Sequence, residues 1–273
     1  MTDSEISITE PGSPAGNAVR PVLSVVIPVH NEVANIASLV DEVEAALDGH
    51  LAFELLVVDD YSSDDTAKIV LELAAARPWL KVCRHRTNAG QSAAVLTGVR
   101  AAGADWIATL DGDGQNDPAD IPALWQMHLQ QAEFNMICGH RQKRRDTLVK
   151  RLSSRIANAV RSRMLGDDTP DTGCGLKLFN RADFLAIPHF DHLHRFLPAL
   201  FRRQGGHITS VAVNHRPRGG GQSHYGIGNR LWVGIVDMIG IMWLKRRPVM
   251  VEVEVIPNES IGRDPQGGAQ NGS

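Results

Sequence analysis

Asp111, Asp113 and Gln115 are the residues of this sequence whose types and spacing best suit chemistry. They follow a short apolar run at 106–110, and Gly112 and Gly114 separate them. If strand alternation continued past the run, the three side chains would point to one side. Their oxygen atoms suit a hard cation, Mg²⁺ or Mn²⁺, that keeps open positions for phosphate oxygens. A plain Asp-Gly turn after a buried strand would explain the same residues, so both interpretations stay open at this point.

Strand and helix patterns alternate along the first half of the chain. Apolar runs predict strands at 22–29, 51–58, 80–85, 106–110 and 134–139, and helical spacing predicts helices at 32–47, 62–76, 91–102 and 118–131. The alternation predicts an α/β fold with a doubly wound, mostly parallel sheet. Ligands gather at the carboxyl ends of strands in such sheets. Residues 30–32, 59–60 and 111–115 all follow strands, so a shared metal and nucleotide site on one rim becomes the favoured interpretation.

The second half of the sequence is less regular. We expect a basic helix at 147–165, an edge strand at 176–179, a helix at 195–204 after a loop, a strand at 207–213 and a Gly-rich basic loop at 214–225. An apolar stretch at 231–244 follows. The predicted organisation is a disordered N-terminus (1–20), a catalytic domain (21–228), an amphipathic helix at the membrane interface (229–248) and a flexible tail (249–273).

Charge is distributed unevenly along the 273 residues. The formal net charge is −3, from 28 Lys and Arg against 31 Asp and Glu, yet residues 140–163 hold nine basic residues and one acid. Residues 202–247 hold eight basic residues and one acid. One face is therefore expected to meet phosphate or anionic lipid, although a solvated basic face would show the same pattern. We expect no nucleic-acid partner.

The histidines and cysteines give little sign of a further metal site. Three cysteines without metal or redox spacing indicate a reducing compartment. The spacing of His189, His192, His194 and His215 does not repeat that of zinc ligands on a helix.

Membrane attachment is expected without a transmembrane segment. The polar N-terminus does not resemble a signal peptide, and no apolar run reaches the ~20 residues that span a bilayer. As a helix, residues 231–244 would be ~21 Å long. We expect this helix to lie in the interface, anchored by Trp232, Trp243 and the basic residues 245–247. Packing on the protein or in a dimer is the alternative. The predicted location is the cytoplasmic face of the membrane, as a peripheral protein.

Several motifs carry a family resemblance over residues 21–247. The segments PVHNE (28–32), VVDDYSSDDT (57–66), NAGQSAA (88–94) and DGDGQ (111–115) resemble family 2 glycosyltransferases with the GT-A fold. The segments RLSSRIA (151–157), TGCGLK (172–177) and RGGGQS (218–223) are similar to the polyprenyl-phosphate branch, which includes dolichol-phosphate mannosyltransferases and bacterial aminoarabinose and galacturonate transferases. HRFLPAL (194–200) and HRPR (215–218) favour the bacterial members.

The resemblance implies a role for each matching position. Base and ribose would be held by Pro28, His30, Glu32, Val58 and Asp60. The metal on the diphosphate would be held by Asp111, Asp113 and Gln115. Donor or acceptor phosphates would be bound by Arg141, Arg151, Ser154, Arg155, Arg218 and Ser223. Asp113, Arg151 and Arg218 are the expected catalytic residues.

Some of these positions have simpler explanations or depart from the family. Glu32 could begin a helix, Asp59 could cap a turn, and Asp171 could be structural. His30 stands where the family usually has Tyr, and Tyr61 stands where it has Gly or Asp, which leaves the base open between uracil and guanine. His224 stands where many mannosyltransferases have Lys.

The acceptor is expected to be a lipid phosphate. An alcohol acceptor needs a general base, and hydroxyl-using family members commonly carry one in a Glu-Asp pair. No such pair occurs between residues 120 and 225. A phosphate is already anionic and needs cationic clamps, which arginine supplies. We therefore predict metal-dependent, inverting transfer from a nucleotide-sugar such as UDP-galacturonate or GDP-mannose to a polyprenyl phosphate, for cell-envelope glycan or lipopolysaccharide modification.

Three other functions compete with this prediction. A dehydrogenase would carry Gly-x-Gly-x-x-Gly after the first strand, and a nucleotidyltransferase would carry a Gly-rich loop there. PVHNE (28–32) is neither. The remaining alternative is a non-catalytic peripheral membrane module that retains the fold, against which Asp111, Asp113 and Arg218 argue.

Overall fold

A computed structural model of the chain describes residues 20–141, 164–166, 169–217 and 227–247. The strands are β1 (Leu23–Val29), β2 (Phe53–Asp59), β3 (Leu80–Arg84), β4 (Trp106–Thr109), β5 (Phe134–Arg141), β6 (Lys177–Asn180) and β7 (His207–Val213). The helices are α1 (Ile36–Leu47), α2 (Thr66–Ala74), α3 (Gln91–Ala101), α4 (Ile121–Gln130), α6 (Arg181–Ala186), α7 (Leu197–Arg203) and α8 (Ile227–Lys245). Two short 3-10 helices are η1 (Pro118–Asp120) and η2 (Leu193–Arg195).

The strands form a single sheet in the order β3-β2-β1-β4-β6-β5-β7. β1 is an interior strand and pairs in parallel with both β2 and β4. All seven of its residues are buried, because a parallel strand with helices on both faces leaves no side for solvent. β6 runs antiparallel to β4 and β5, and the other neighbours run parallel. The predicted α/β fold with a mostly parallel sheet is confirmed.

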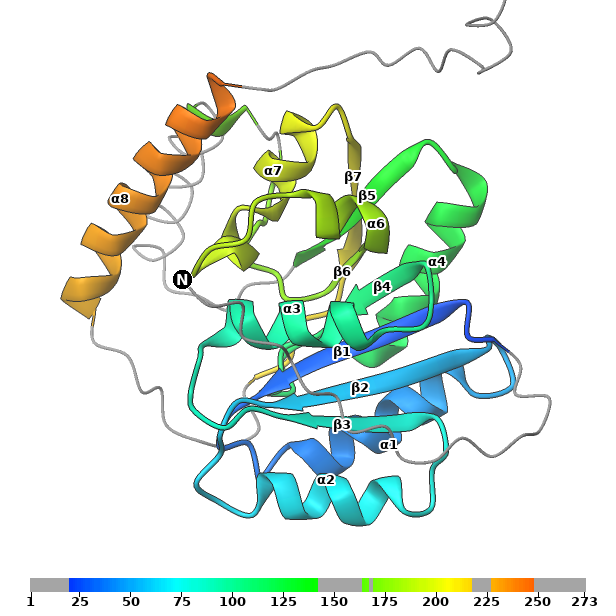
Figure 1. Cartoon of the computed structure of the whole chain (residues 1–273). Coiled ribbons are helices and arrows are strands. Elements are labelled where there is room, and N and C mark those ends of the chain that lie inside the picture. The colour runs from blue at the N-terminus through cyan, green and yellow to red at the C-terminus, as the bar shows by residue number, and fades with distance from the viewer. Residues whose placement is uncertain (1–19, 142–163, 167–168, 218–226, 248–273) are drawn as a thin grey trace, which may run out of the picture.

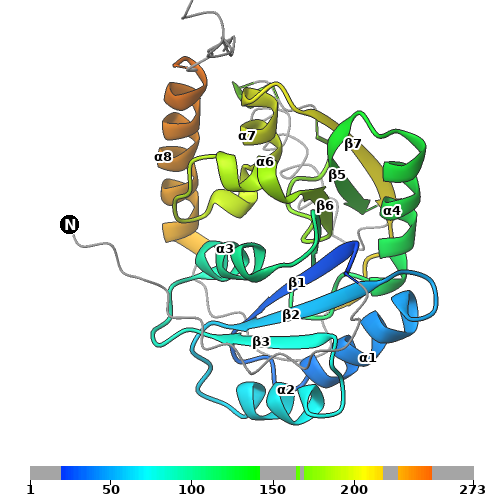
Figure 2. The ribbon, with the colours of Figure 1, turned by 45° about the vertical axis from the view of Figure 1, so that its right-hand side comes forward.

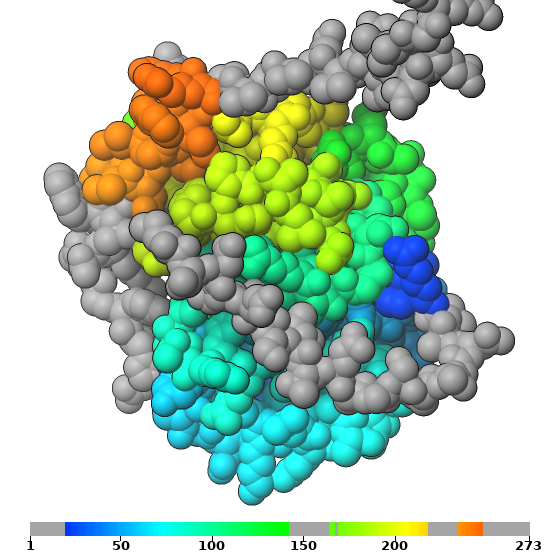
Figure 3. Space-filling model, viewed as in Figure 1, coloured from blue at the N-terminus to red at the C-terminus, as the bar shows by residue number. Residues whose placement is uncertain are grey.

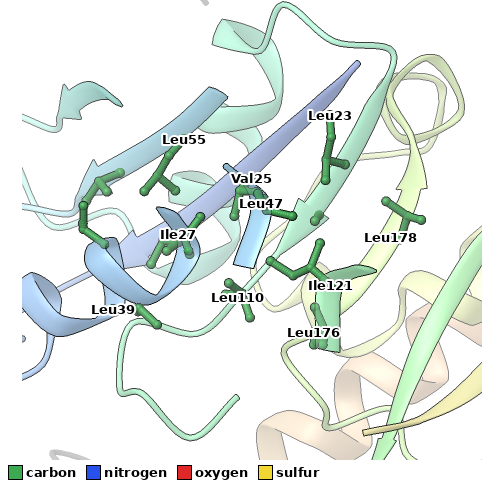
Figure 4. Close-up of a cluster of buried hydrophobic side chains, with 14 of the residues drawn as sticks. Leu23, Val25, Ile27, Leu39, Leu47, Leu55, Leu110, Ile121, Leu176 and Leu178 are labelled. Atoms are coloured by element: carbon green, nitrogen blue, oxygen red, sulfur yellow. The ribbon is translucent and has the colours of Figure 1, made fainter. Parts of the chain in front are cut away.

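Helices cover both faces of this sheet and bury two apolar cores. Helices α1, α2 and α4 lie on one side, and α3, α6 and α7 lie on the other (Figures 1 and 2). Figure 4 shows the first core, in which Ile27 of β1 and Leu55 of β2 meet Leu39 of α1. The second core includes Phe179, whose ring contacts those of Phe184 and Phe201.

Two local predictions were wrong. The helix expected from residue 32 begins at Ile36, after a turn at 33–35 in which the amides of Asn35 and Ile36 donate to the Glu32 carbonyl. The strand expected at an edge, β6, lies between β4 and β5 instead, with Lys177 opposite Thr109 on one side and Cys138 on the other. A four-residue strand has too few residues for its sequence to show how many neighbours it has.

The apolar stretch at 231–244 lies within α8, whose bounds differ by two or three residues from the expected helix at 229–248. Met238, Ile241 and Leu244 face the second core, and Arg203 Nε donates to the Leu244 carbonyl at 3.0 Å. Asp237 lies 3.3 Å from His192 Nδ1 and so ties α8 to the loop before η2. No helix in the described ranges has the length and apolarity needed to cross a membrane.

A buried carboxylate joins three elements at the end of the sheet away from residues 111–115. Glu54 in β2 is 3% exposed and accepts bonds from Ser24 Oγ, Lys81 Nζ and the Gly103 amide at 2.5–2.7 Å. Burial by itself would raise the pKa of this carboxyl, but the three bonds together lower it. The charged form of Glu54 therefore stabilises the fold.

We expect Glu54→Gln to lower the free energy of unfolding by about 1–2 kcal/mol at pH 7. A carboxyl with a lowered folded-state pKa stabilises above its unfolded pKa of about 4.3, and this contribution is lost as pH falls through the folded value. The deficit of the variant should therefore shrink at pH 3. Urea unfolding at both pH values measures it, and an equal deficit at both would contradict the assignment.

Candidate active site

Three loops converge at the carboxyl end of the central strands. Pro28 pairs with Val58 in the sheet, and the Asp60 amide donates to the Val29 carbonyl at 2.8 Å. Gly112 lies so close to the end of β1 that a Cβ there would stand 2.8 Å from Val29 Cγ1. The segments following β1, β2 and β4 therefore share one rim, as the sequence predicted.

The loops after β1 and β2 are locked together by hydrogen bonds. The Asn31 amide donates to Ser62 Oγ at 2.9 Å, and the Glu32 amide donates to Thr66 Oγ1 at 2.9 Å. Glu32 itself is buried, and its carboxylate accepts from Asn35 Nδ2 at 2.7 Å. The Glu32 carbonyl accepts the amides of Asn35 and Ile36, both at 3.0 Å, so the explanation that Glu32 begins the helix stays open beside a ligand contact.

The two adjacent aspartates at the end of β2 have separate partners. Asp59 is fully buried, lies 3.0 Å from Arg84 and accepts the Ser62 amide, which matches the predicted turn cap. Asp60 accepts the amides of Ala89 and Gly90, both at 2.8 Å, and contacts His85 Nδ1 at 2.7 Å. Asp60 thus fixes the turn that begins α3, and its contact with a nucleotide stays a prediction.

The remaining nucleotide-binding candidates differ in exposure. His30 is exposed, and its Nδ1 lies 2.9 Å from the Asp60 carbonyl. Val58 is completely buried, so only its backbone could reach a ligand. Tyr61 is 51% exposed, with a positive φ of 61°. At the end of β1 the side chains of His30 and Tyr61 are therefore open to solvent, whereas the side chain of Val58 is not.

Residues 111–115 form a turn rather than an extension of the strand. β4 ends at Thr109, and Asp113 Oδ1 accepts the amide of Gln115 at 3.1 Å across Gly114, whose φ is 71°. Continued strand alternation therefore does not describe this segment. The turn interpretation and the metal interpretation are both compatible with this geometry, because the turn brings two carboxylates together at the end of β4.

The environment of Asp111 suits a cation ligand. Its Oδ1 accepts from Gln91 Nε2 at 2.8 Å. Burial raises the pKa of this carboxyl, as does the nearby charge of Asp113, while Lys177, Gln91 and Arg141 oppose the rise. A Cβ at position 175 would lie 2.2 Å from Asp111 Oδ2, so Gly175 leaves the space that the carboxylate occupies.

The oxygen donors at this turn are compatible with a metal that shares its coordination between protein and substrate. No group of three or more His, Cys, Asp or Glu side chains suited to a metal occurs in the part of the chain that the structure describes, the four histidines considered for zinc included. Mg²⁺ is commonly held by one or two carboxylates together with water and substrate phosphates. Asp111 and Asp113 match that pattern.

A cavity of about 180 Å³ opens beside Asp111 on the α3 side of the sheet. Its apolar lining includes Pro28, Val95 and Leu197. Its polar lining comes from the segments between β5 and α7 as well as from α3 and β4: Gln91, Thr109, Asp111, Thr172, Lys177, His194 and Arg195.

His194 forms a neutral wall of this cavity. Its Nδ1 lies 2.8 Å from Ser92 Oγ at the start of α3. Burial lowers the pKa of His194 to about 3, with further contributions from the charges of Lys177, Arg195 and His192. At neutral pH its imidazole is therefore uncharged.

The segment after β7 is hydrogen-bonded to the carboxylate turn, residues 111–115. Asn116 and His215 form an isolated β-bridge, and the Arg216 amide donates to the Gln115 carbonyl at 2.9 Å. The Arg216 guanidinium bonds to Glu42 of α1 and lies 2.6 Å from Asp117. Arg216 therefore joins the turn, α1 and the start of the Gly-rich loop.

We expect Arg216→Gln to raise the KM for donor and metal about 10-fold while leaving the thermal midpoint within a few degrees, because a loosened turn misplaces Asp111 and Asp113. Arg77→Gln is the matched control. Like Arg216, Arg77 pairs with two acids, but these are Asp41 and Glu44, which lie far from the rim. Steady-state kinetics at several Mn²⁺ concentrations measures the effect. Equal KM changes in both variants would refute a positioning role.

Other predicted phosphate-binding residues fall into two groups. Arg141 ends β5 and makes a bidentate ion pair with Asp171 at 2.6 and 2.8 Å, which supports the structural interpretation of Asp171. Arg151, Ser154, Arg155, Arg218 and Ser223 lie outside the described residues, as do His224 and most of the predicted basic helix 147–165.

The sequence interpretation did not single out Gln91, Lys177 or Arg216. Gln91 and Lys177 stood inside motifs used only for the family resemblance, and Arg216 stood inside the HRPR segment. A lysine within the apolar run LKLF (176–179) was the available signal for Lys177.

Solved structures with this arrangement are GT-A glycosyltransferases. Glucosyl-3-phosphoglycerate synthase from Mycobacterium tuberculosis, solved with Mn²⁺, UDP-glucose and phosphoglyceric acid, matches with a TM-score of 0.62 at 22% identity, covering 82% of this chain and 79% of that one. The same enzyme with Mg²⁺ and UDP matches equally well. This likeness establishes the fold.

The chain belongs to glycosyl transferase family 2, whose model matches residues 24–187. The dodecaprenyl-phosphate galacturonate synthase of Rhizobium johnstonii is 34% identical over 82% of this chain and 67% of its own length. The undecaprenyl-phosphate 4-deoxy-4-formamido-L-arabinose transferase of Pseudomonas savastanoi is 35% identical over 74% of this chain. The aligned part spans 60% of that transferase.

Proposed function

We propose that this glycosyltransferase moves a sugar from a nucleoside-diphosphate sugar to a polyprenyl phosphate, with inversion at the anomeric carbon. The observation that carries the proposal is the composition of the cavity. Among its described lining residues Asp111 is the sole carboxylate, and the others include two cations, Lys177 and Arg195. An acceptor that needs no general base suits such a site. The names of the relatives, which transfer sugars to dodecaprenyl or undecaprenyl phosphate, point the same way.

The donor is proposed to lie along the rim. Pro28, His30, Glu32, Val58 and Asp60 would surround its base and ribose, with the sugar directed toward the cavity beside Asp111. Asp111, Asp113 and Gln115 would hold Mg²⁺ or Mn²⁺ on the diphosphate. The bound cation would supply positive charge that stabilises the departing nucleoside diphosphate.

The acceptor phosphate is proposed to be its own nucleophile. One of its oxygens forms a bond to the anomeric carbon while the bond from that carbon to the β-phosphate oxygen breaks, and the electron pair leaves with the nucleoside diphosphate. The proposed clamps for these phosphates are Arg141, Arg151, Ser154, Arg155, Arg218 and Ser223. Arginine suits this task because its planar fork pairs two phosphate oxygens at once.

The lipid tail of the acceptor calls for a membrane surface, for which α8 is the proposed contact. Val236, Ile239 and Trp243 form an apolar stripe on its outer side and are 54%, 59% and 59% exposed. Figure 3 shows α8, in orange, at the surface of the molecule. Exposed Arg246 and Arg247 follow the stripe, and Arg247 lies 5.4 Å from the Trp243 ring. Such a stripe with cationic residues at its end suits the cytoplasmic surface of an anionic bilayer.

Transfer of label into lipid tests the proposed function. The protein is incubated with Mn²⁺, undecaprenyl phosphate and labelled UDP-galacturonate, UDP-glucose or GDP-mannose, and the organic phase is counted. Label from at least one donor supports the transferase, and the anomeric configuration of the product, read by NMR, tests inversion. No transfer from any donor by protein that still binds vesicles would favour a non-catalytic membrane module instead.

A further inference from the structure

Lys177 is a buried cation with incomplete bonding. It lies in β6, in the middle of the sheet, and is 5% exposed. Its ammonium group carries three donors. In the described part of the chain, the one hydrogen-bond partner of Nζ is the carbonyl of Cys174. Burying an ammonium group is costly unless its donors are satisfied, so the donors that have no partner among the described residues suit a ligand in the cavity that Lys177 lines.

The cavity that Lys177 lines has the size of a single sugar. Drug-sized ligands occupy pockets of roughly 300–1,000 Å³, whereas this cavity measures about 180 Å³. Its apolar walls, Val95 and Leu197, can pack against a pyranose ring. A whole nucleotide-sugar does not fit, so its nucleotide must lie outside, along the rim.

The charges around the cavity favour an anion. Lys177 and Arg195 both line it, and His194, which also lines it, has an uncharged imidazole at neutral pH. The acid that lines it, Asp111, is assigned to the cation in the proposed function. A carboxylate brought in by the substrate would therefore meet positive charge without a competing acid.

We propose that Lys177 selects the sugar by pairing with the carboxylate of a hexuronosyl donor. This inference rests on the proposed function. It assigns a nucleoside-diphosphate hexuronate as the donor class and Lys177 as the specificity-determining residue. The relative named as a galacturonate synthase transfers a sugar of this class.

Donor competition in wild-type protein and in Lys177→Met tests the assignment. With Mn²⁺ and undecaprenyl phosphate, wild type should use UDP-galacturonate with a kcat/KM at least about 100-fold above that for UDP-galactose, which carries a neutral hydroxymethyl group in place of the carboxylate. Lys177→Met should lose about 100-fold with UDP-galacturonate and less than about 3-fold with UDP-galactose. Lys177→Arg should retain most of the preference.

Lys68→Met is the control, since Lys68 is exposed on α2. Measurement of UDP binding tests the alternative role, in which Lys177 binds the diphosphate or neutralises the charge of Asp111. If Lys177→Met weakens UDP as much as UDP-galacturonate, the assignment is overturned. Equal kcat/KM values of the wild type for UDP-galacturonate and UDP-galactose would also overturn the assignment. Absence of transfer from every donor would instead refute the proposed function.

Discussion

Asp113→Asn is expected to reduce sugar transfer about 10³-fold while leaving the fold intact. Losing a charged metal ligand costs several kcal/mol in the transition state, and each 1.36 kcal/mol is tenfold in rate. The side chain of Asn has the same shape, and its Oδ1 can still accept the Gln115 amide that Asp113 Oδ1 accepts now. The turn should persist, so the loss would come from the missing charge.

The measurement is the rate of label transfer to undecaprenyl phosphate, together with Mn²⁺-dependent UDP binding by calorimetry. In wild type, UDP should bind far more weakly without the cation, and Asp113→Asn should remove most of that dependence. Asp105→Asn is a matched control, because Asp105 precedes β4 at its other end and its side chain is 74% exposed. Transfer by Asp113→Asn within about 3-fold of wild type would refute the metal assignment.

The sheet and its rim could be predicted because they depend on local patterns. The buried run of β1 has no polar residue to accommodate except Ser24, and the first four strands each begin and end within two residues of the prediction. Carboxyl ends of parallel strands meet at one edge, so residues 30–32, 59–60 and 111–115 had to be neighbours.

The cavity wall could not be predicted in the same way. Lys177 lines the same cavity as Asp111 only because β6 inserts antiparallel beside β4, with Lys177 opposite Thr109, which is 68 residues earlier in the chain. Arg216 contacts Glu42 across 174 residues. Neither arrangement leaves a periodic signal in the sequence, since Lys177 and Arg216 are single residues whose positions depend on the whole sheet.

The contacts of Asp60 show that this residue positions other elements of the site. Its carboxylate accepts two amides of the turn before α3, and α3 presents Gln91 to Asp111 and Ser92 to His194. Through α3, Asp60 therefore orders both the carboxylate turn and the cavity wall. A nucleotide contact by Asp60 would have to coexist with this network.

The position of α8 links the cavity to the proposed membrane surface. Asp237 on its inner side lies 3.3 Å from His192, two residues before His194 in the cavity wall. The outer side carries the apolar stripe of Val236, Ile239 and Trp243. The proposed membrane contact therefore lies on a helix that is bonded to the segment forming the cavity wall.

Replacing Ile239 and Trp243 together by Glu should weaken vesicle binding at least about 100-fold. Each large apolar side chain gains about 1.5–3 kcal/mol on burial, and both are 59% exposed without a lipid. Transfer to undecaprenyl phosphate in vesicles should fall in parallel, whereas transfer to a short-chain prenyl phosphate in solution should remain near the wild-type rate. Flotation with phosphatidylethanolamine and phosphatidylglycerol vesicles measures binding.

The double variant Leu71→Glu with Leu129→Glu provides the matched control for this effect. These leucines are 58% and 57% exposed on α2 and α4, so the variant adds the same charge and removes comparable apolar surface away from α8. If the control variant lost as much vesicle binding as the α8 variant, the added negative charge would explain the loss, and a role of the apolar stripe would be refuted. If the α8 variant floated normally but changed its oligomeric state in size-exclusion chromatography, the stripe would be a dimer contact, which would refute its role at the membrane.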